Sequence, residues 1–305
     1  MRYSFVTADV FTRTPFGGNP LSVFPDARGL SSEVMQRIAS EINYSEITFV
    51  LPPDDPANTA KVRIFTPRNE VPFAGHPNVG TAYLLALQGE VFGRPLGDRM
   101  RFEEGAGLVA VEIERDGGRP TGARIVAPKP LSTGPGLAVD EVAACLGIAA
   151  SGVRTTTHPP VFGSVGLRFL LVELVDRATL VRAAPQLSAF AECDSRYPLE
   201  HDMFCIFAYT RAERGADCDL HARMFAPLDG IVEDPATGSA NAALTALLAS
   251  LAPDADARLD LVVRQGDEIG RPSLLRLCAS KSGGRVGQVS VAGDCVAMIE
   301  GALRL

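Results

Sequence analysis

The sequence lacks the features that mark several common classes of protein. None of its six cysteines lies in a C-x-x-C pair, and their irregular spacing favours reduced, buried thiols over a disulfide framework. No apolar run reaches the roughly 18 residues of a membrane-spanning helix. The segment Met1–Val10 also lacks the apolar region of a signal peptide. We therefore expect a cytoplasmic protein that does not associate with membranes.

An excess of positive charge is also missing. The formal net charge is −7 and the isoelectric point is about 5.2. Nucleic acids and anionic membranes are bound by clustered Lys and Arg, so we expect neither as a partner. The four histidines are far apart and form no H-E-x-x-H pair, so we expect no metal site and a structural role for His158, His201 and His221. No Walker A motif or complete dinucleotide fingerprint is present, and Phe162 stands where the G-x-S-x-G motif of hydrolases requires Gly.

What the sequence does contain is a short phrase written twice. The pattern P-x-x-G-[ST]-A occurs at Pro77–Ala82 and again at Pro235–Ala240. A second match precedes each copy, since Arg63–Pro67 reads R-I-F-T-P and Arg223–Pro227 reads R-M-F-A-P. Two matches in the same order predict two structurally related halves. A role of both phrases in packing alone, with glycines for close contact between helix and strand, is equally compatible with the residues.

The segments around these matches predict an α+β fold. Each phrase opens a helix that is apolar on all sides and must therefore be enclosed, with Pro77 and Pro235 in the first helical turn and Asp234 as an N-cap. Short strands outnumber helices elsewhere, and one of them, Val286–Ile299, is expected to break at Gly293. We predict two curled sheets, each wrapped around one helix. Residues 1–128 form the first lobe and 129–305 the second, with the C-terminal strand able to complete either lobe.

The polar residues near the two helix starts suit proton transfer. A helix N-terminus holds a carboxylate well, and two related halves that face each other would bring two such termini to one cleft. Glu46 is expected in a turn before the strand Thr48–Leu51, where it can act as a base or simply be a solvated surface residue. The other polar candidates are His76, Asn78, Thr81, Asp234, Thr237 and Ser239. Carboxylates, an imidazole and hydroxyls without a thiol favour acid–base chemistry on carbon.

A set of motifs in order along nearly the whole chain resembles the PhzF family of phenazine-biosynthesis isomerases. The motifs are Asp9–Phe11, Phe16–Leu21, Ser45-Glu46, Phe73–Pro77, Glu233–Ala240, Gln265-Gly266 and Gly270–Ser273. The resemblance implies a diaminopimelate epimerase-like fold of two pseudo-symmetric lobes, and a homodimer. It also implies a cofactor-independent isomerase with Glu46 as general acid/base in the inter-lobe cleft, and His76 and Asp234 as further catalytic residues. Asn19, Gly75, Asn78, Gly238 and Ser239 are the corresponding candidates for substrate binding.

Two alternatives to isomerisation remain open at this point. Relatives in the wider superfamily use two thiols for racemisation, but Gly75 and Asp234 occupy the matching positions here and no cysteine lies in either motif. An epimerase or racemase would therefore pair Glu46 with Asp234 or His76. A non-catalytic ligand-binding dimer with the same fold is the other alternative. The expected ligand is a small carboxylate or amino-acid-like molecule, and Asn78, where Thr is frequent in the family, leaves its identity open.

Overall fold

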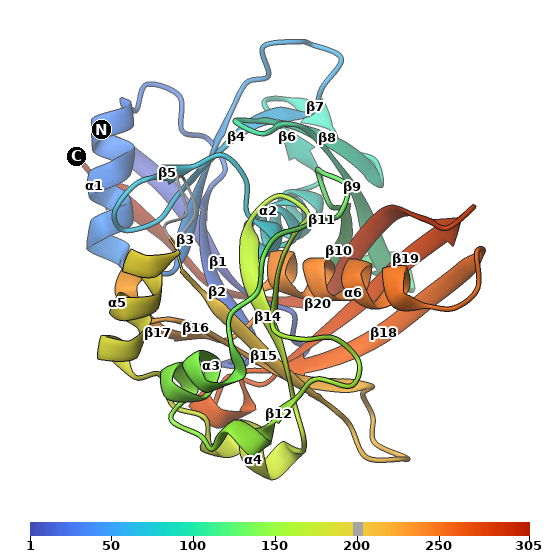
Figure 1. Ribbon diagram of the computed structural model, residues 1–305. Helices are drawn as coiled ribbons and strands as arrows, with labels where there is room; N and C mark the ends of the chain where they lie inside the picture. Colours follow the sequence, from blue (N-terminus) through green and yellow to red (C-terminus); the bar gives the residue numbers. More distant parts are fainter. Residues whose placement is uncertain (198–203) are drawn as a thin grey trace. The chain divides into compact units, whose positions relative to one another are not determined.

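The computed structural model describes residues 1–197 and 204–305, and it divides into two compact units (Figure 1). Unit 1 comprises Met1–Pro128 and Ser290–Leu305, and unit 2 comprises Lys129–Val289. The chain passes from one unit to the other after Pro128, which is the boundary expected between the lobes. Unit 2 ends at Val289 and not at residue 305, because the C-terminal segment pairs with strands of unit 1.

In unit 1 the strands form a closed ring around one helix. Its strands are β1 (Arg2–Val10), β2 (Asn19–Phe24), β3 (Glu46–Leu51), β4 (Ala60–Phe65), β5 (Glu70–Val71), β6 (Glu90–Val91), β7 (Arg94–Pro95), β8 (Arg99–Glu104), β9 (Gly107–Asp116), β10 (Arg119–Val126) and most of β20 (Arg285–Arg304). The pairings run β1–β2–β3–β4–β8–β9–β10–β20 and return to β1. Helix α2 (Gly75–Gln88) packs against β1, β2, β9 and β10, and α1 (Ser32–Ile42) packs against β3 and β4. The apolar helix is therefore enclosed, as its sequence predicts.

Unit 2 contains a second sheet and a second apolar helix. Its strands are β11 (Ser132–Thr133), β12 (Val153–Arg154), β13 (Val161–Ser164), β14 (Arg168–Leu174), β15 (Ile206–Arg211), β16 (Leu220–Ala226), β17 (Ile231–Asp234), β18 (Ala257–Gln265) and β19 (Ser273–Ser282). Its helices are α3 (Val139–Leu146), α4 (Arg177–Arg182), α5 (Leu187–Arg196) and α6 (Gly238–Leu251). Helix α6, orange in Figure 1, packs against β13, β14, β18 and β19. The buried ammonium of Lys281 donates to the carbonyls of Ser250 and Ala252 at the end of α6, where a cation is favourable.

The two units repeat the same local pattern, which confirms the α+β fold of two related lobes. Strand β4 pairs antiparallel with β5 and parallel with β8, and β16 pairs in the same way with β17 and β18. Each of these strands carries an arginine that pairs with a glutamate on the next strand and lies over a phenylalanine ring. The two sets are Arg63, Glu70 and Phe65 in unit 1, and Arg223, Glu233 and Phe225 in unit 2.

The repeated phrase itself is out of register with the structure. Helix α2 begins at Gly75, so Pro77 is its third residue, whereas α6 begins at Gly238 and Pro235 lies before it. The N-cap of α6 is Thr237 and not Asp234, which is the last residue of β17. The expectations that Pro235 occupies the first turn and that Asp234 caps the helix were therefore wrong. A motif of small residues matched by chance at different positions along the two helices.

The residues that do correspond are two asparagines. Asn78, fourth in α2, donates from Nδ2 to the carbonyl of the N-cap residue Ala74 at 3.0 Å. Asn241, fourth in α6, donates to the carbonyl of its own N-cap residue, Thr237, also at 3.0 Å. The first turns of the two helices are therefore equivalent, Gly75 to Gly238 and His76 to Ser239.

Strand β20 is continuous through Gly293, where a break was expected. A Cβ at this position would lie 2.2 Å from Cδ1 of Phe11, which itself has a φ of 68°. The glycine is therefore required for close approach of the Phe11 ring and does not end the strand.

Candidate functional site

Glu46 is the first residue of β3 and not part of the preceding turn. Strand β3 pairs parallel with β2, which places Glu46 opposite Leu21. The Glu46 side chain is 20% exposed, and its Oε2 lies 3.7 Å from Nε2 of His76. A largely shielded carboxylate thus lies next to an imidazole at the start of α2.

Several local contacts hold β3 against the start of α2. The hydroxyl of Ser45 donates to Oδ1 of the buried Asn19 at 3.1 Å, and the hydroxyls of Thr48 and Thr81 lie 2.8 Å apart. Gly80 allows the close approach of α2, because a Cβ there would lie 2.6 Å from Cδ2 of Leu21. Gly80 therefore has the role in close helix–strand packing that was the alternative interpretation of the repeated phrase. The same close packing positions the hydroxyls of Thr48 and Thr81.

His76 is neutral in this environment. Its side chain is 5% exposed, and burial lowers its pKa to about 3 against an opposing hydrogen bond with the backbone of Pro20. The 3.7 Å approach to Glu46 is therefore a contact between a carboxylate and a neutral ring, and not a salt bridge. Such an imidazole accepts protons weakly and is better suited to hydrogen bonding than to a role as base.

The first turn of α2 is suited to an anion. Its N-cap is Ala74, whose side chain has no atom that could accept from the amides of Gly75 and His76. Asn78 is fully buried, and among the described residues its Oδ1 has no hydrogen-bond partner. Candidates Asn19, Glu46, Gly75, His76 and Asn78 all belong to unit 1, around this turn.

In unit 2 the corresponding turn is braced by a glutamine. Oε1 of Gln265 accepts from the amide of Thr237 at 3.1 Å and from Nδ2 of Asn241 at 2.9 Å. Its Nε2 donates to the carbonyl of Asp234 at 2.8 Å and to Oγ1 of Thr237 at 3.0 Å. The Thr237 hydroxyl donates to Oδ2 of Asp234 at 2.5 Å. Candidates Gly238 and Ser239 are the first two residues of α6, directly after this network.

Two residues near these turns were missed from the sequence. Glu104 follows the buried Met100 and Phe102 on β8, and Gln265 follows the buried Val263 on β18. The alternation of strand faces places both polar side chains toward the interior. This period-two pattern along β8 and β18 is the sequence signal that could have identified both residues.

Of the remaining histidines, two lie in unit 2 with local partners. The ring of His158 hydrogen-bonds to the Tyr209 hydroxyl and to the carbonyl of Pro159, each at 2.8 Å. His221 lies 3.6 Å from Sγ of Cys218. His201 is outside the described residues. All six cysteines are free, and among the described residues no group of three or more His, Cys, Asp or Glu side chains could hold a metal ion.

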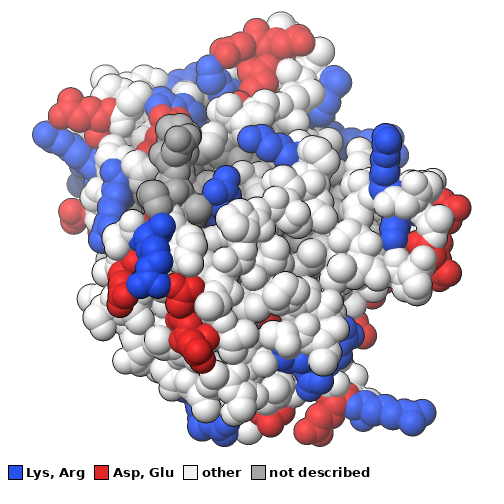
Figure 2. Space-filling view, viewed as in Figure 1, with Lys and Arg blue, Asp and Glu red and all other residues white. Residues whose placement is uncertain are grey.

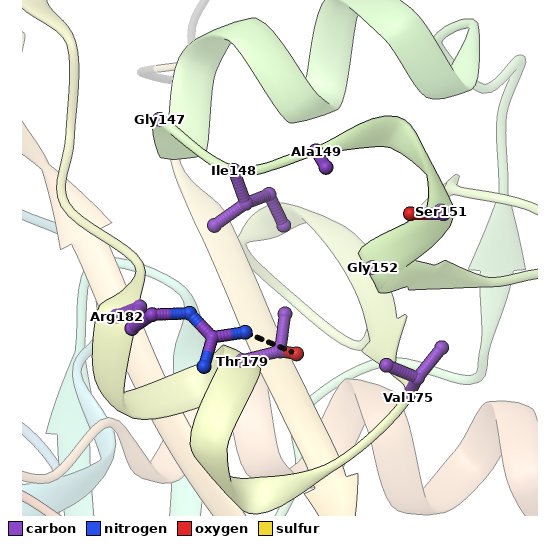
Figure 3. Close-up of a pocket in the computed structure, with 8 residues that line it drawn as sticks. All are labelled: Gly147, Ile148, Ala149, Ser151, Gly152, Val175, Thr179 and Arg182. Carbon is purple, nitrogen blue, oxygen red and sulfur yellow. Dashed lines mark hydrogen bonds between the residues drawn. The ribbon is translucent and has the colours of Figure 1, made fainter.

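A hollow of about 500 Å³ in unit 2 lies apart from these candidates (Figure 3). Its lining comprises Gly147, Ile148, Ala149, Ser151, Gly152, Val175, Thr179 and Arg182. Arg182 donates to the Thr179 hydroxyl at 3.1 Å, and the described residues that line the hollow include no acid and no further base. The hollow therefore offers no pair of groups for proton transfer.

The charged side chains follow no single sign on the face shown in Figure 2. Lysines and arginines lie among aspartates and glutamates there, and much of the face between them is uncharged. In the described part of the chain, the helices are too short or too polar to cross a bilayer.

Comparison with known proteins identifies the chain's relatives. The phenazine biosynthesis-like protein family, PhzC-PhzF, matches residues 8–301. The chain belongs to this family. It is 37% identical to a trans-2,3-dihydro-3-hydroxyanthranilate isomerase of Pseudomonas chlororaphis, over 99% of this chain and 100% of the relative. It is also 34% identical to an uncharacterized isomerase of Mesorhizobium japonicum, with 98% of each chain covered.

Solved structures support the same assignment for this PhzF-family chain. A phenazine biosynthesis protein of the PhzF family from Bacillus anthracis superposes with a TM-score of 0.87, at 25% identity and with all of both chains covered. A hydroxyproline epimerase from Agrobacterium vitis has a TM-score of 0.66 at 12% identity, over 99% of this chain and 91% of the other. The second likeness shows the fold alone, and together they confirm the epimerase-like architecture.

Proposed function

We propose that the protein is a PhzF-type isomerase that moves a proton between carbon atoms of a small carboxylate. The observation that supports this most directly is the Glu46 carboxylate, 3.7 Å from a neutral imidazole and next to a helix start without a capping side chain. The family relationship and the names of its curated relatives support an isomerase over a ligand-binding protein.

In the proposed reaction Glu46 takes a proton from a substrate carbon. The electrons of the broken C–H bond pass into the substrate's conjugated system, and the amides at the start of α2 stabilise the resulting negative charge. Glu46 then returns the proton to a different carbon, so atoms and electrons balance without another reactant. His76, with its lowered pKa, donates or accepts a hydrogen bond and is not the base.

The roles of Asp234, Gly238 and Ser239 are proposed from the correspondence of the two helix starts. The first turn of α6 also offers backbone amides, and Thr237 uses its hydroxyl on Asp234 and not as a cap. We propose that this turn also binds a carboxylate. Ser239→Ala should then raise KM without an equal loss of kcat.

The alternative is epimerisation by Glu46 with a second base, and its product distinguishes it from isomerisation. His76 is a poor second base at neutral pH, which leaves Asp234 as the candidate. An epimerase incorporates solvent deuterium at a carbon whose configuration inverts, whereas an isomerase moves a double bond.

The test is turnover of trans-2,3-dihydro-3-hydroxyanthranilate in deuterated water, followed by NMR. The wild-type protein and Glu41→Gln, a change on the exposed end of α1, should form a rearranged product, which contains deuterium to the extent that the proton on Glu46 exchanges with solvent before its return. Glu46→Gln should form none while retaining its circular dichroism spectrum. Full activity of Glu46→Gln would refute the mechanism. No rearrangement of this compound by the wild type would refute it as the substrate, and a panel of related amino-carboxylates would follow.

A further inference from the structure

The position that braces the first turn of α6 has an equivalent in unit 1. On β16 and β18, His221 lies opposite Arg264, and Gln265 is the next residue. On β4 and β8, Lys61 lies opposite Glu103, and Glu104 is the next residue. Because β4 corresponds to β16 through the repeated arginine and phenylalanine, Glu104 corresponds to Gln265.

The turns that follow these two residues support the same correspondence. A Cβ on Gly105 would lie 3.0 Å from Cα of Pro72, and a Cβ on Gly266 would lie 2.6 Å from the carbonyl oxygen of Pro235. The amide of Ala106 also donates to the carbonyl of Pro72 at 2.9 Å. Pro72 leads into α2 as Pro235 leads into α6, so β8 delivers Glu104 to the start of its helix.

The two equivalent residues differ in how well they are hydrogen-bonded. Gln265 uses both its amide oxygen and its amide nitrogen, as described above. Both carboxyl oxygens of Glu104 are buried, and neither has a hydrogen-bond partner among the residues that the structure describes. Its neighbour Glu103, on the other face of β8, accepts from the amides of Asp54 and Asp55 and from Asn58.

Glu104 and Asn78 both have buried side-chain oxygens without a hydrogen-bond partner among the described residues. Oδ1 of Asn78 is buried without a donor in the described part of the chain, as is Oδ1 of Asn241 in unit 2, and the Asn78 side chain interacts with the Glu104 carboxyl in the sense that favours its charged form. A carboxylate cannot supply a proton to Oδ1, but a carboxylic acid can. Burial favours the acid, because it raises the pKa of Glu104 to about 8 despite an opposing effect of Asn78.

We propose that Glu104 is a positioning residue whose protonated carboxyl donates to Asn78 and braces the first turn of α2. In this proposal Glu104 is the counterpart of Gln265, which hydrogen-bonds to Thr237 and Asn241 at the start of α6, but it acts on Asn78 through a group that can lose a proton. Once deprotonated, it places a negative charge beside the helix start and opposes a bound anion. That consequence for substrate binding rests on the proposed function, whereas the bracing role does not.

No charged neighbour among the described residues accounts for this behaviour. The Glu104 pKa has burial and Asn78 as its causes, without a charged side chain. Charged side chains of the surrounding elements form ion pairs of their own. Lys61 of β4 pairs with Asp54, and Glu70 of β5 pairs with Arg63. On β9, Glu112 pairs with Arg99 and Glu114 with Arg124, and His76 of α2 is neutral. Protonation of Glu104 itself is thus the variable to measure.

The first test needs no substrate. NMR titration of protein with ¹³C-labelled glutamate carboxyls and ¹⁵N-labelled amides should show one carboxyl with a midpoint near pH 8 that is absent from Glu104→Gln. The side-chain amide of Asn78 and the backbone amides of Gly75 and His76 should shift with the same midpoint in the wild type. Glu103→Gln is the matched control and should leave that titration unchanged.

Two results would overturn the bracing role. One is a Glu104 carboxyl that titrates near its ordinary value, and the other is a titration near pH 8 that leaves Asn78 and Gly75 unmoved. The wild-type titration decides both, so a Glu104→Gln protein that fails to fold does not prevent the answer.

The second test uses the isomerase assay. Wild-type kcat/KM should fall about tenfold per pH unit above pH 8 through a rise in KM, as expected for one ionisation of the free enzyme. In Glu104→Gln this fall should disappear, whereas Glu104→Ala should raise KM at all pH values. A KM of Glu104→Gln that still rises above pH 8 would refute the link to substrate binding. Absence of any turnover by the wild type would refute the proposed function and leave the NMR result standing.

Discussion

The starts of α2 and α6 show how one arrangement can be held in two chemical forms. Both helices are 14 residues long and begin with glycine, and both carry a fourth-position asparagine that hydrogen-bonds back to the N-cap carbonyl. At α6 the neighbour of the asparagine is Gln265, an amide with a fixed charge of zero. At α2 it is Glu104, an acid that is neutral only below about pH 8.

The difference shows that equivalent positions need not carry equivalent energetics. Both ends of the Gln265 amide are hydrogen-bonded without an ionisable proton on Gln265, although Oδ1 of Asn241 is buried without a partner among the described residues. The start of α2 contains buried polar atoms whose satisfaction depends on a proton, and it lies next to Glu46 and His76. Unsatisfied buried groups of this kind are tolerated where a protein has a function to perform.

The largest expected effect is the pH dependence of stability due to Glu104. An unfolded glutamate loses its proton near pH 4.5, and folded Glu104 near pH 8, so between these values the folded state binds more protons. The unfolding free energy therefore decreases as pH rises through this window, by roughly 5 kcal/mol at 1.36 kcal/mol per pH unit, and is constant above it.

Denaturant unfolding of the wild type and Glu104→Gln across this range measures the effect. His76 acts in the opposite sense, since its lowered pKa makes stability rise with pH between about 3 and 6.5. The difference between the two proteins removes that contribution and isolates Glu104. Parallel curves for the two proteins would contradict the prediction, and Glu103→Gln serves as the control.

The next effect compares the acids of the two units. Glu46→Gln should lower kcat by about 10³-fold or more, to below detection in the NMR assay, since this is the scale of general acid–base catalysis by the group that transfers the proton. Asp234→Asn should cost less, because its carboxylate is held by the Thr237 hydroxyl and is proposed to bind or position. Single-turnover assays with the substrate of the wild type measure both. Equal losses of kcat, with inversion at one carbon, would favour an epimerase with two acids.

These expectations also show what the sequence could and could not predict. The apolar helices, the repeated Arg-x-Phe strands and the position of His76 at a helix start were predictable, since they depend on local pattern, whereas the role expected for Glu46 came from the resemblance to the PhzF family. The 3.7 Å between Glu46 and His76 was not, because it follows from the pairing of β2 with β3 and the packing of α2.

The register of the repeat failed for a different reason. A helix start is defined by where the backbone amides and the asparagine side chains hydrogen-bond, and small residues such as Gly, Ser and Ala carry little of that information. The equivalence of Asn78 and Asn241 is evident only when both are seen to bond to an N-cap carbonyl. The alternation along β8 could have identified Glu104, but its equivalence to Gln265 follows only from the pairing of β4 with β8 and of β16 with β18.

Exchange of the brace in unit 2 should have a smaller effect on stability. Gln265→Glu replaces Nε2, which donates to Asp234 and Thr237, by an oxygen that cannot donate when charged. We expect a loss of about 3 kcal/mol at pH 7, the upper range for a buried group left without its partner, and a smaller loss at pH 5. Denaturant unfolding at both pH values measures this loss of stability. Glu268→Gln is not a suitable control, because Glu268 forms an ion pair with Arg177. A pH-independent cost would show that shape, not charge, is what Gln265 contributes.

The smallest effect concerns how closely each helix packs in its own unit. Gly80 is two residues after Asn78 in α2, and the equivalent residue of α6 is Ala243, which is fully buried. Gly80→Ala should gain about 1 kcal/mol of helix propensity but lose about 2 kcal/mol by overpacking, because the new methyl would meet Leu21 and Val10 at 2.6 and 2.7 Å. The net loss of about 1 kcal/mol is measurable by denaturant unfolding, with Ala243→Gly as the reciprocal change. A gain in stability would mean that β1 and β2 move to accommodate the methyl group. Gly80 would then matter more for positioning Thr81 and Thr48 near Glu46 than for packing.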